Sequence, residues 1–219
     1  MRTDELLSLQ KGAGEWVHPD EPLFQIVHQS TELWLKLTCL HLSRALDHIE
    51  GGDPVLAEPL VQRAADAVRL VTDQLRSLRQ VSPAQFAVIR TVLGNGSGFE
   101  SPGWRQVRAL TGDLDVAFGR VLAADGVTAV KVYQGCPTAP LYRLAEALVE
   151  LDERIALWRT EHYSIAVRII GHGVLGTGRT PVDSLARLIT HRCFPQLWQA
   201  RTEITETGPA GQPAGEGLR

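Results

Sequence analysis

The stretch PLYRLAEALVELDERIALWRTEHYSIAVRIIG, residues 140–171, decides the fold of this chain. Apolar side chains recur in it at intervals of three and four residues, which predicts one helix from about Pro140 to about Gly171. The apolar stripe comprises Leu141, Leu144, Leu148, Leu151, Ile155, Trp158, His162, Ile165 and Ile169. Because His162 takes a position where the pattern calls for an apolar residue, we expect its imidazole to face the interior of a helical bundle.

Helical periodicity extends over most of the remaining sequence. Ser82 followed by Pro83 predicts a helix start, because serine caps free N–H groups and proline suits the first turn. Residues 127–132 are interpreted as a short extended piece, although a single such piece makes no sheet. Further helices are expected from about Pro22 to Ile49, Pro54 to Gln80, Ser82 to Gly94, Gly103 to Ala123 and over residues 181–190. The sequence therefore predicts an all-α fold, a helical bundle.

The chain is long enough for one domain with a sizeable core, at 219 residues. Neither an internal repeat nor a linker divides it, so we expect a single domain over residues 1–204. The last segment, residues 205–219, reads TETGPAGQPAGEGLR. Because it is rich in glycine and proline and poor in apolar side chains, we expect a disordered C-terminal tail.

Charge, hydropathy and cysteine content exclude several classes of partner. The net charge is −3, from 22 basic and 25 acidic residues without a basic cluster, so nucleic acid and anionic membranes are not expected partners. No apolar run approaches the roughly 20 residues that span a membrane, and the N-terminus lacks the pattern of a secretory signal. Cys39, Cys136 and Cys193 lie far apart without a C-x-x-C-H motif. This spacing favours a reduced, cytoplasmic chain and argues against haem attached through thioethers.

A second histidine occupies a comparable position in the first long helix. His28 lies one turn after Phe24, among residues expected to be inside. A histidine in a core often does no more than form hydrogen bonds there. Two such histidines on separate long helices nevertheless favour haem, because a rigidly held neutral imidazole is the usual proximal ligand of haem iron. Zinc is disfavoured, because no H-E-x-x-H or C-x-x-C spacing occurs.

Five blocks of sequence carry a resemblance to a known family. They are DELLSLQ (4–10), EPLFQIVHQSTELWLK (21–36), FAVIRTVLGNGSGFES (86–101), WRTEHYSIAVRIIG (158–171) and FPQLWQAR (194–201). In this order, on helices of matching periodicity, they resemble the tryptophan 2,3-dioxygenase superfamily of haem-dependent aromatic oxygenases. The chain looks like a shortened member. The resemblance implies an all-α bundle that encloses a b-type haem.

The resemblance implies roles for the residues around the haem. It makes His162 the proximal ligand of the iron and His28 the distal, catalytic histidine beside the indole nitrogen of the substrate. It also implies that Phe24 and Phe86 line the aromatic part of the substrate pocket. The tryptophans of these blocks, Trp34, Trp158 and Trp198, are interpreted as core packing without a catalytic role.

Further residues would bind the amino-acid part of the substrate. By resemblance, Arg90 binds the substrate carboxylate, the Ser97-Gly98 turn lies against haem and substrate, and Thr177 contacts the ammonium and carboxylate. The chemistry is consistent, because a guanidinium offers a buried carboxylate two hydrogen bonds that lysine cannot match. Arg90 could also be an ordinary surface arginine, but its position one turn after Phe86 on an apolar helix favours the binding role.

The chain also departs from the family pattern. It starts almost at DELLSLQ, so the family's preceding tyrosine-containing segment is expected to be missing. The region between the SGFES block and the long helix is shorter than in the family, as though a helical insertion were absent. The turn after the long helix reads GTGRTP and lacks the second glycine that usually follows GTG.

The function implied by the resemblance is that of an oxidoreductase. Haem b and O2 would convert L-tryptophan, or a close derivative, to N-formylkynurenine by 2,3-dioxygenation, in a cytoplasmic homo-oligomer that is a dimer or a tetramer. One alternative is a haem-dependent monooxygenase of tryptophan, methyl-tryptophan or tyrosine in specialised metabolism. Two others are a non-catalytic haem- or ligand-binding bundle and a helical interaction protein without a ligand.

Overall fold

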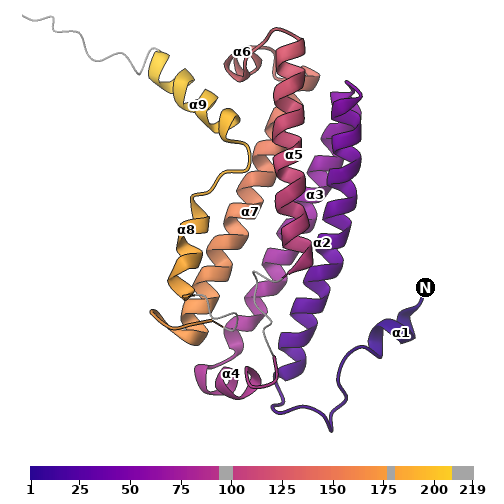
Figure 1. Ribbon diagram of the computed structural model, residues 1–219, viewed down its shortest axis with the longest axis vertical. Helices are drawn as coiled ribbons and strands as arrows, with labels where there is room; N and C mark the ends of the chain where they lie inside the picture. Colours follow the sequence, from indigo (N-terminus) through magenta and orange to yellow (C-terminus); the bar gives the residue numbers. More distant parts are fainter. Residues whose placement is uncertain (94–100, 177–180, 209–219) are drawn as a thin grey trace, which may run out of the picture.

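Four long helices lie alongside one another in the computed structural model, which describes residues 1–93, 101–176 and 181–208 (Figure 1). They are α2 (Glu21–Glu50), α3 (Pro54–Leu75), α5 (Pro102–Ala124) and α7 (Pro140–Ile170). Helix α3 packs between α2 and α7, and α2 packs on its other side against α5. Side chains of α5 and α7 meet in the same core cluster, which completes the four-helix bundle.

Shorter elements connect and cover these helices. They are α1 (Thr3–Leu7), the 3-10 helix η1 (Arg76–Gln80), α4 (Pro83–Ile89), α6 (Ala129–Gln134), the 3-10 helix η2 (Val182–Leu185), α8 (Ala186–Ile189) and α9 (Pro195–Thr207). Helix α8 runs beside the C-terminal half of α7, and α1 extends away from the bundle (Figure 1). The described residues form no strand, only one isolated bridge between Leu175 and Pro181. The all-α prediction is confirmed.

Helix starts follow the capping chemistry of the sequence. Ser82 accepts a hydrogen bond from the backbone N–H of Gln85, whose side chain in turn accepts one from the backbone of Ser82, which completes a capping box. Asp53 caps α3 and Ser101 caps α5 in the simpler one-bond form. The long helix ends at Gly171, whose φ of 95° lies in a region that favours glycine.

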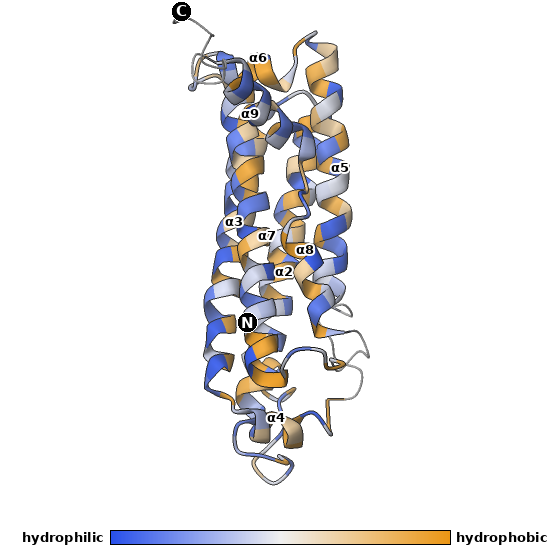
Figure 2. Cartoon of the chain, turned by 90° about the vertical axis from the view of Figure 1, so that its left-hand side faces the viewer, coloured by the Kyte–Doolittle hydropathy of each residue, from blue (hydrophilic) through white to orange (hydrophobic). Residues whose placement is uncertain are grey.

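The core runs along the inside of the bundle. Figure 2 shows the helices striped, with hydrophobic and hydrophilic residues on different faces. The largest fully buried side chains include Leu35, Leu114, Phe118, Leu148 and Phe194. A second, smaller cluster around Val27, Phe86, Ile89 and Ile165 closes the end of the bundle that carries α4.

The clearest differences from the predicted elements lie at residues 127–132 and at the end of the third predicted helix. Residues 129–134 form helix α6 and no extended piece, because Thr128 caps the backbone N–H of Lys131 and starts a helical turn. The third predicted helix ends at Ile89 and does not reach residue 94. Residues 94–100 lie outside the described structure.

The C-terminal helix passes the predicted end of the domain. Helix α9 continues to Thr207, so the expected boundary between residues 204 and 205 falls inside a helix. Residues 209–219, most of the predicted tail, are not among the described residues. Within the part of the chain that is described, no helix is long and apolar enough to cross a membrane.

Candidate active site

A pocket of about 410 Å³ lies between α2, α5 and α7, near the end of the bundle that carries α4. Its wall includes Phe24 and His28 from α2, Trp104 from α5, and Trp158 and His162 from α7. We call it the central pocket. The two histidines are 134 positions apart in sequence, and the bundle brings both to one cavity.

His28 is oriented by its own helix. Its Nδ1 lies 2.7 Å from the carbonyl oxygen of Phe24 one turn earlier. A carbonyl only accepts hydrogen bonds, so Nδ1 carries the hydrogen. The surrounding protein lowers the pKa of His28 through desolvation, opposed by the Phe24 carbonyl and the charge of Glu32. The neutral ring therefore has an unprotonated Nε2, which can accept a hydrogen bond from a ligand.

The side chain of His28 is exposed onto the central pocket and not enclosed in the core. The sequence placed it among inward-facing residues, and it does lie on the pocket side of α2. Since a pocket wall is reachable by solvent, an inward-facing position here does not mean complete burial.

His162 is the more deeply enclosed of the two. Desolvation lowers its pKa to about 4, with a smaller contribution from His28 nearby, so the ring is neutral at neutral pH. Its imidazole stacks on the indole of Trp158, with centroids 4.9 Å apart and planes inclined by 8°. The expectation that His162 faces the interior agrees with its place in the wall of the central pocket.

The two predicted phenylalanines lie together beside His28. The ring of Phe24 stacks on His28 at 4.2 Å and contacts Phe86 of α4 at 5.5 Å. Phe86 is buried behind Phe24, in the cluster that closes this end of the bundle. Phe24 therefore gives the pocket an aromatic side next to the free nitrogen of His28, whereas Phe86 is not in the pocket wall and packs behind Phe24.

Arg90 follows α4 directly and is half-buried, but it is not in the wall of the central pocket. One of its terminal nitrogens donates a hydrogen bond to the carbonyl oxygen of Leu175, at 3.4 Å. Leu175 is two residues before Thr177, so the guanidinium reaches the segment that carries the predicted threonine. Thr177, Ser97 and Gly98 themselves lie outside the described residues.

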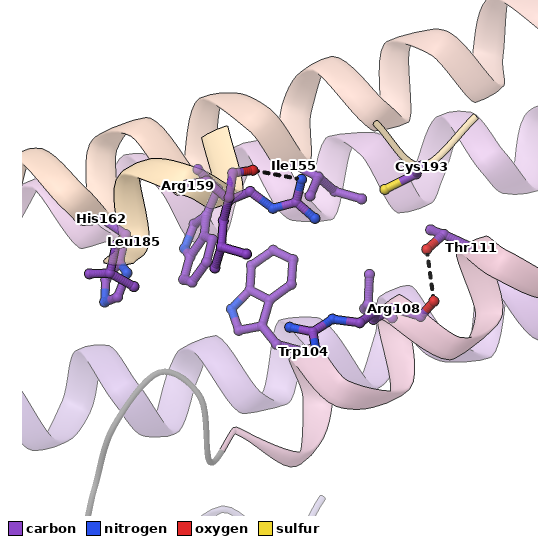
Figure 3. Close-up of a pocket in the computed structure, with 11 residues that line it drawn as sticks. Trp104, Arg108, Thr111, Ile155, Arg159, His162, Leu185 and Cys193 are labelled. Carbon is purple, nitrogen blue, oxygen red and sulfur yellow. Dashed lines mark hydrogen bonds between the residues drawn. The ribbon is translucent and has the colours of Figure 1, made fainter. Parts of the chain in front are cut away.

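Two tryptophans, Trp104 and Trp158, belong to this site although the sequence did not predict a role for either in it. Trp158, interpreted as core packing, lines the central pocket, and Trp104 packs on it with centroids 4.1 Å apart. Both also line a smaller side pocket between α5, α7 and α8, together with His162 and Arg159 (Figure 3). The signal for Trp158 was present, because residues four apart on a helix share a face.

Glu32 is the other residue that was missed. It lies one turn after His28 on α2, lines the central pocket, and accepts hydrogen bonds from the Ser101 hydroxyl and the Gly103 backbone N–H at the start of α5. A carboxylate is favourable at a helix N-terminus, where N–H groups lack partners within the helix. Glu32 thereby joins the helix of His28 to the helix of Trp104.

The donor set fits haem better than a bare metal ion. Among the described residues, no group of three or more His, Cys, Asp or Glu side chains is placed to hold a metal. One or two imidazoles are too few to bind a bare metal ion on their own. They are enough for haem iron, because the porphyrin supplies most of the iron's other ligands. The aromatic and apolar side chains of Phe24, Val27 and Trp104 in the wall suit the face of such a macrocycle.

Comparison with known proteins gives a consistent picture. The family model described as tryptophan 2,3-dioxygenase matches residues 1–122, more than half of the chain. The tryptophan 2,3-dioxygenase of Myxococcus xanthus (strain DK1622) is 28% identical over an alignment of 264 residues that covers 97% of this chain and 91% of that protein. The tryptophan 2,3-dioxygenase of Xanthomonas euvesicatoria pv. vesicatoria (strain 85-10) is 26% identical, and the alignment covers 97% of this chain and 89% of that protein.

The two kinds of match cover different parts of the site. The family model includes the part that carries His28, whereas the half with His162 is covered by the full-length relatives. The first alignment, at 264 residues, is longer than the 219-residue chain, so the relative has residues that this chain lacks. This agrees with the expectation of a shortened chain.

Proposed function

The chain belongs to the tryptophan 2,3-dioxygenase family, and from this membership we propose that it is a haem-dependent oxygenase of L-tryptophan. The product of 2,3-dioxygenation would be N-formylkynurenine, formed when both atoms of O2 enter the indole ring. The observation that carries the proposal is the pairing of His28 and His162 across one pocket whose wall is largely aromatic and apolar.

His162 would hold the iron of a b-type haem. Its ring is neutral, because desolvation keeps its pKa at about 4, and only a neutral imidazole has a lone pair to give to a metal. The haem, when bound, would supply the redox chemistry that activates O2. The protein supplies the position of the ligand, a pocket wall with a large apolar part, and the contacts that orient the substrate.

His28 would orient the indole. The hydrogen bond from Nδ1 to the Phe24 carbonyl leaves Nε2 as an acceptor, and an indole N–H is a donor only. The two groups are therefore complementary without any proton transfer. Phe24 and Phe86 would pack against the rings of the substrate, where aromatic pairs are worth about 0.5–1.5 kcal/mol each.

Arg90 and Thr177 would bind the amino-acid part of the substrate. The guanidinium already bonds to Leu175, so a substrate carboxylate at Arg90 would lie next to the turn that carries Thr177. The Ser97-Gly98 turn, seven and eight residues after Arg90 in sequence, would lie against the haem and the amino acid. These assignments follow the residues of this chain that match the family pattern.

The direct test is an aerobic reaction of reduced, haem-loaded protein with L-tryptophan, analysed by mass spectrometry. We expect a product heavier than tryptophan by two oxygen atoms, with both atoms labelled when the gas is heavy-isotope O2. A product heavier by one oxygen atom would replace the dioxygenase by a monooxygenase of tryptophan, methyl-tryptophan or tyrosine. A haem-loaded protein that leaves tryptophan, methyl-tryptophan and tyrosine unchanged would reject both functions.

The protein would act as a homo-oligomer, a dimer or a tetramer. Support comes from α2, where Ile26, Leu33, Leu37 and Leu40 are between 38% and 55% exposed. Their spacing of seven, four and three residues forms one stripe, which is the pattern of a helix that packs against another helix. Light scattering should give a multiple of the 24.0 kDa chain mass, and Leu33→Glu with Leu40→Glu should reduce it.

The place of action would be the cytoplasm. The three cysteines are free thiols, and they are distributed over buried, half-buried and exposed positions. Free thiols are typical of reducing compartments. Fractionation of the source cells, followed by detection of the protein in the cytoplasmic fraction, tests this assignment.

A further inference from the structure

Three aromatic rings form a row beside the central pocket. Trp158 precedes His162 by one helical turn on α7, and the two rings are nearly parallel, inclined by 8° at 4.9 Å. Trp104 reaches across from α5 and packs on Trp158 at 4.1 Å. The row therefore runs from Trp104 of α5 through Trp158 to His162 of α7.

Hydrogen bonds do not orient His162 within the described structure. His28 has a bond from Nδ1 to the Phe24 carbonyl, whereas His162 has no hydrogen bond of this kind to another of the described residues. A histidine that binds a metal usually donates its other N–H to a carboxylate or carbonyl, and that bond fixes the ring. For His162, the parallel indole of Trp158 is the contact that limits rotation of the ring.

The far end of the row is fixed to the helix of His28. Glu32 on α2 accepts hydrogen bonds from the Ser101 hydroxyl and the Gly103 backbone N–H, directly before Trp104. A Cβ at Gly103 would lie 2.6 Å from the Cβ of Leu35, so only glycine allows α5 to approach α2 this closely. Trp104 is thus held against α2 while its ring supports Trp158.

We infer that Trp158, supported by Trp104, is a positioning residue that sets the orientation of the iron ligand His162 by ring stacking. This inference rests on the proposed haem-binding function. Trp158 touches the imidazole and supplies no reacting atom. Trp158 holds the imidazole of His162 in one rotation. A ring nitrogen of His162 thereby stays directed at a ligand in the central pocket.

The test compares four variants of the full chain, each loaded with haem. Trp158→Leu removes the stacking face, and Trp158→Phe retains a smaller one. Trp104→Leu leaves the Trp158–His162 stack in place and removes the ring that supports it, together with one side chain of the pocket wall. Phe118→Leu is the control, because Phe118 is a fully buried aromatic residue of α5 outside both pockets. The two measurements are the rate of haem release to excess apomyoglobin and the iron–histidine stretching band of the ferrous protein.

We expect Trp158→Leu to release haem about three to ten times faster than the wild type, the range that loss of one aromatic pair implies. Its iron–histidine band should shift or broaden. Trp158→Phe should restore most of both properties, Trp104→Leu should show a smaller change in the same direction, and Phe118→Leu should stay within about twofold of the wild type.

Either of two results would overturn the inference. One is a Trp158→Leu protein with wild-type haem release and an unchanged iron–histidine band. The other is a Phe118→Leu control that changes both measurements as much as Trp158→Leu does. If Trp158→Leu does not fold, an unchanged band in both Trp158→Phe and Trp104→Leu rejects the inference equally. A wild type that binds no haem, or a His162→Ala variant with an unaltered haem spectrum, would instead reject the proposed function.

Discussion

Asp152 on α7 attaches the segment that begins α9 to the bundle, and replacing it tests how much this attachment contributes to stability. The residue is completely buried, and its Oδ2 accepts hydrogen bonds from the backbone N–H of Cys193 at 2.8 Å, that of Phe194 at 3.3 Å and the indole Nε1 of Trp198 at 2.8 Å. Replacement by alanine would leave three donors without an acceptor. Each buried donor left unsatisfied costs about 1–3 kcal/mol.

We therefore expect Asp152→Ala to lower the free energy of unfolding by about 3–5 kcal/mol. This value is near the low end of the summed cost of three unsatisfied donors, because Cys193 is only half-buried and water can reach its N–H group. Asp152→Asn keeps one acceptor oxygen and should lose less. Trp198→Phe removes only the indole donor and should cost about 1 kcal/mol.

Urea denaturation, followed by circular dichroism at two protein concentrations, measures these differences and separates unfolding from dissociation. A loss below about 1 kcal/mol for Asp152→Ala would refute the reasoning, because it would mean that water replaces the carboxyl group without cost. Equal losses for Asp152→Ala and Trp198→Phe would also contradict it, since the two backbone donors would then contribute nothing.

Three further predictions concern the site and its surroundings. His162→Ala should lose most haem or change the ligation seen in its Soret spectrum, whereas His28→Ala should retain haem and alter oxygen reactivity. Equal loss of haem in both variants would contradict the assignment of His162 as the proximal and His28 as the distal histidine. Arg90→Ala should reduce kcat/KM for tryptophan by roughly thirtyfold or more, while binding of tryptamine, which has no carboxylate, should hardly change. The pKa of Glu21 is lowered chiefly by the hydrogen bond from Lys11, so the attachment of the N-terminal segment should be intact above the usual glutamate pKa and weaken as pH falls through the lowered one. Hydrogen exchange of residues 11–17 measures that change, and a Glu21→Gln variant with the same pH dependence would contradict it.

Much of the site followed from local patterns. The three-and-four spacing placed His162 on the inner face of α7 and His28 on the pocket side of α2, because the face of a helical residue depends only on the helical repeat. Glu32 and Trp158 lie one turn from these histidines and could have been found by the same rule. The family prediction is confirmed by the match to residues 1–122, whereas the roles of the individual site residues stay predictions.

Periodicity was a poorer guide to burial. Ile26, Leu33 and Leu40 fit the apolar pattern of the first long helix, yet all three are exposed in the single chain. Helix α2 has apolar residues on more than one face, and a sequence pattern does not say which face meets the core of its own chain. The extended piece predicted at residues 127–132 failed for a related reason, because a short apolar run suits either a helix or a strand until its cap decides.

The sequence by itself determined the long helices, the inward positions of His28 and His162, and the family, since these depend on residues a few positions apart. Only the tertiary structure decided which distant groups meet. It joined Asp152 to Trp198 across 46 positions, Glu32 to Gly103 across 71, and Trp104 of α5 to Trp158 of α7. Such pairs depend on how four helices pack together, and helix packing is set by the whole surface of each helix and not by any one segment of its sequence.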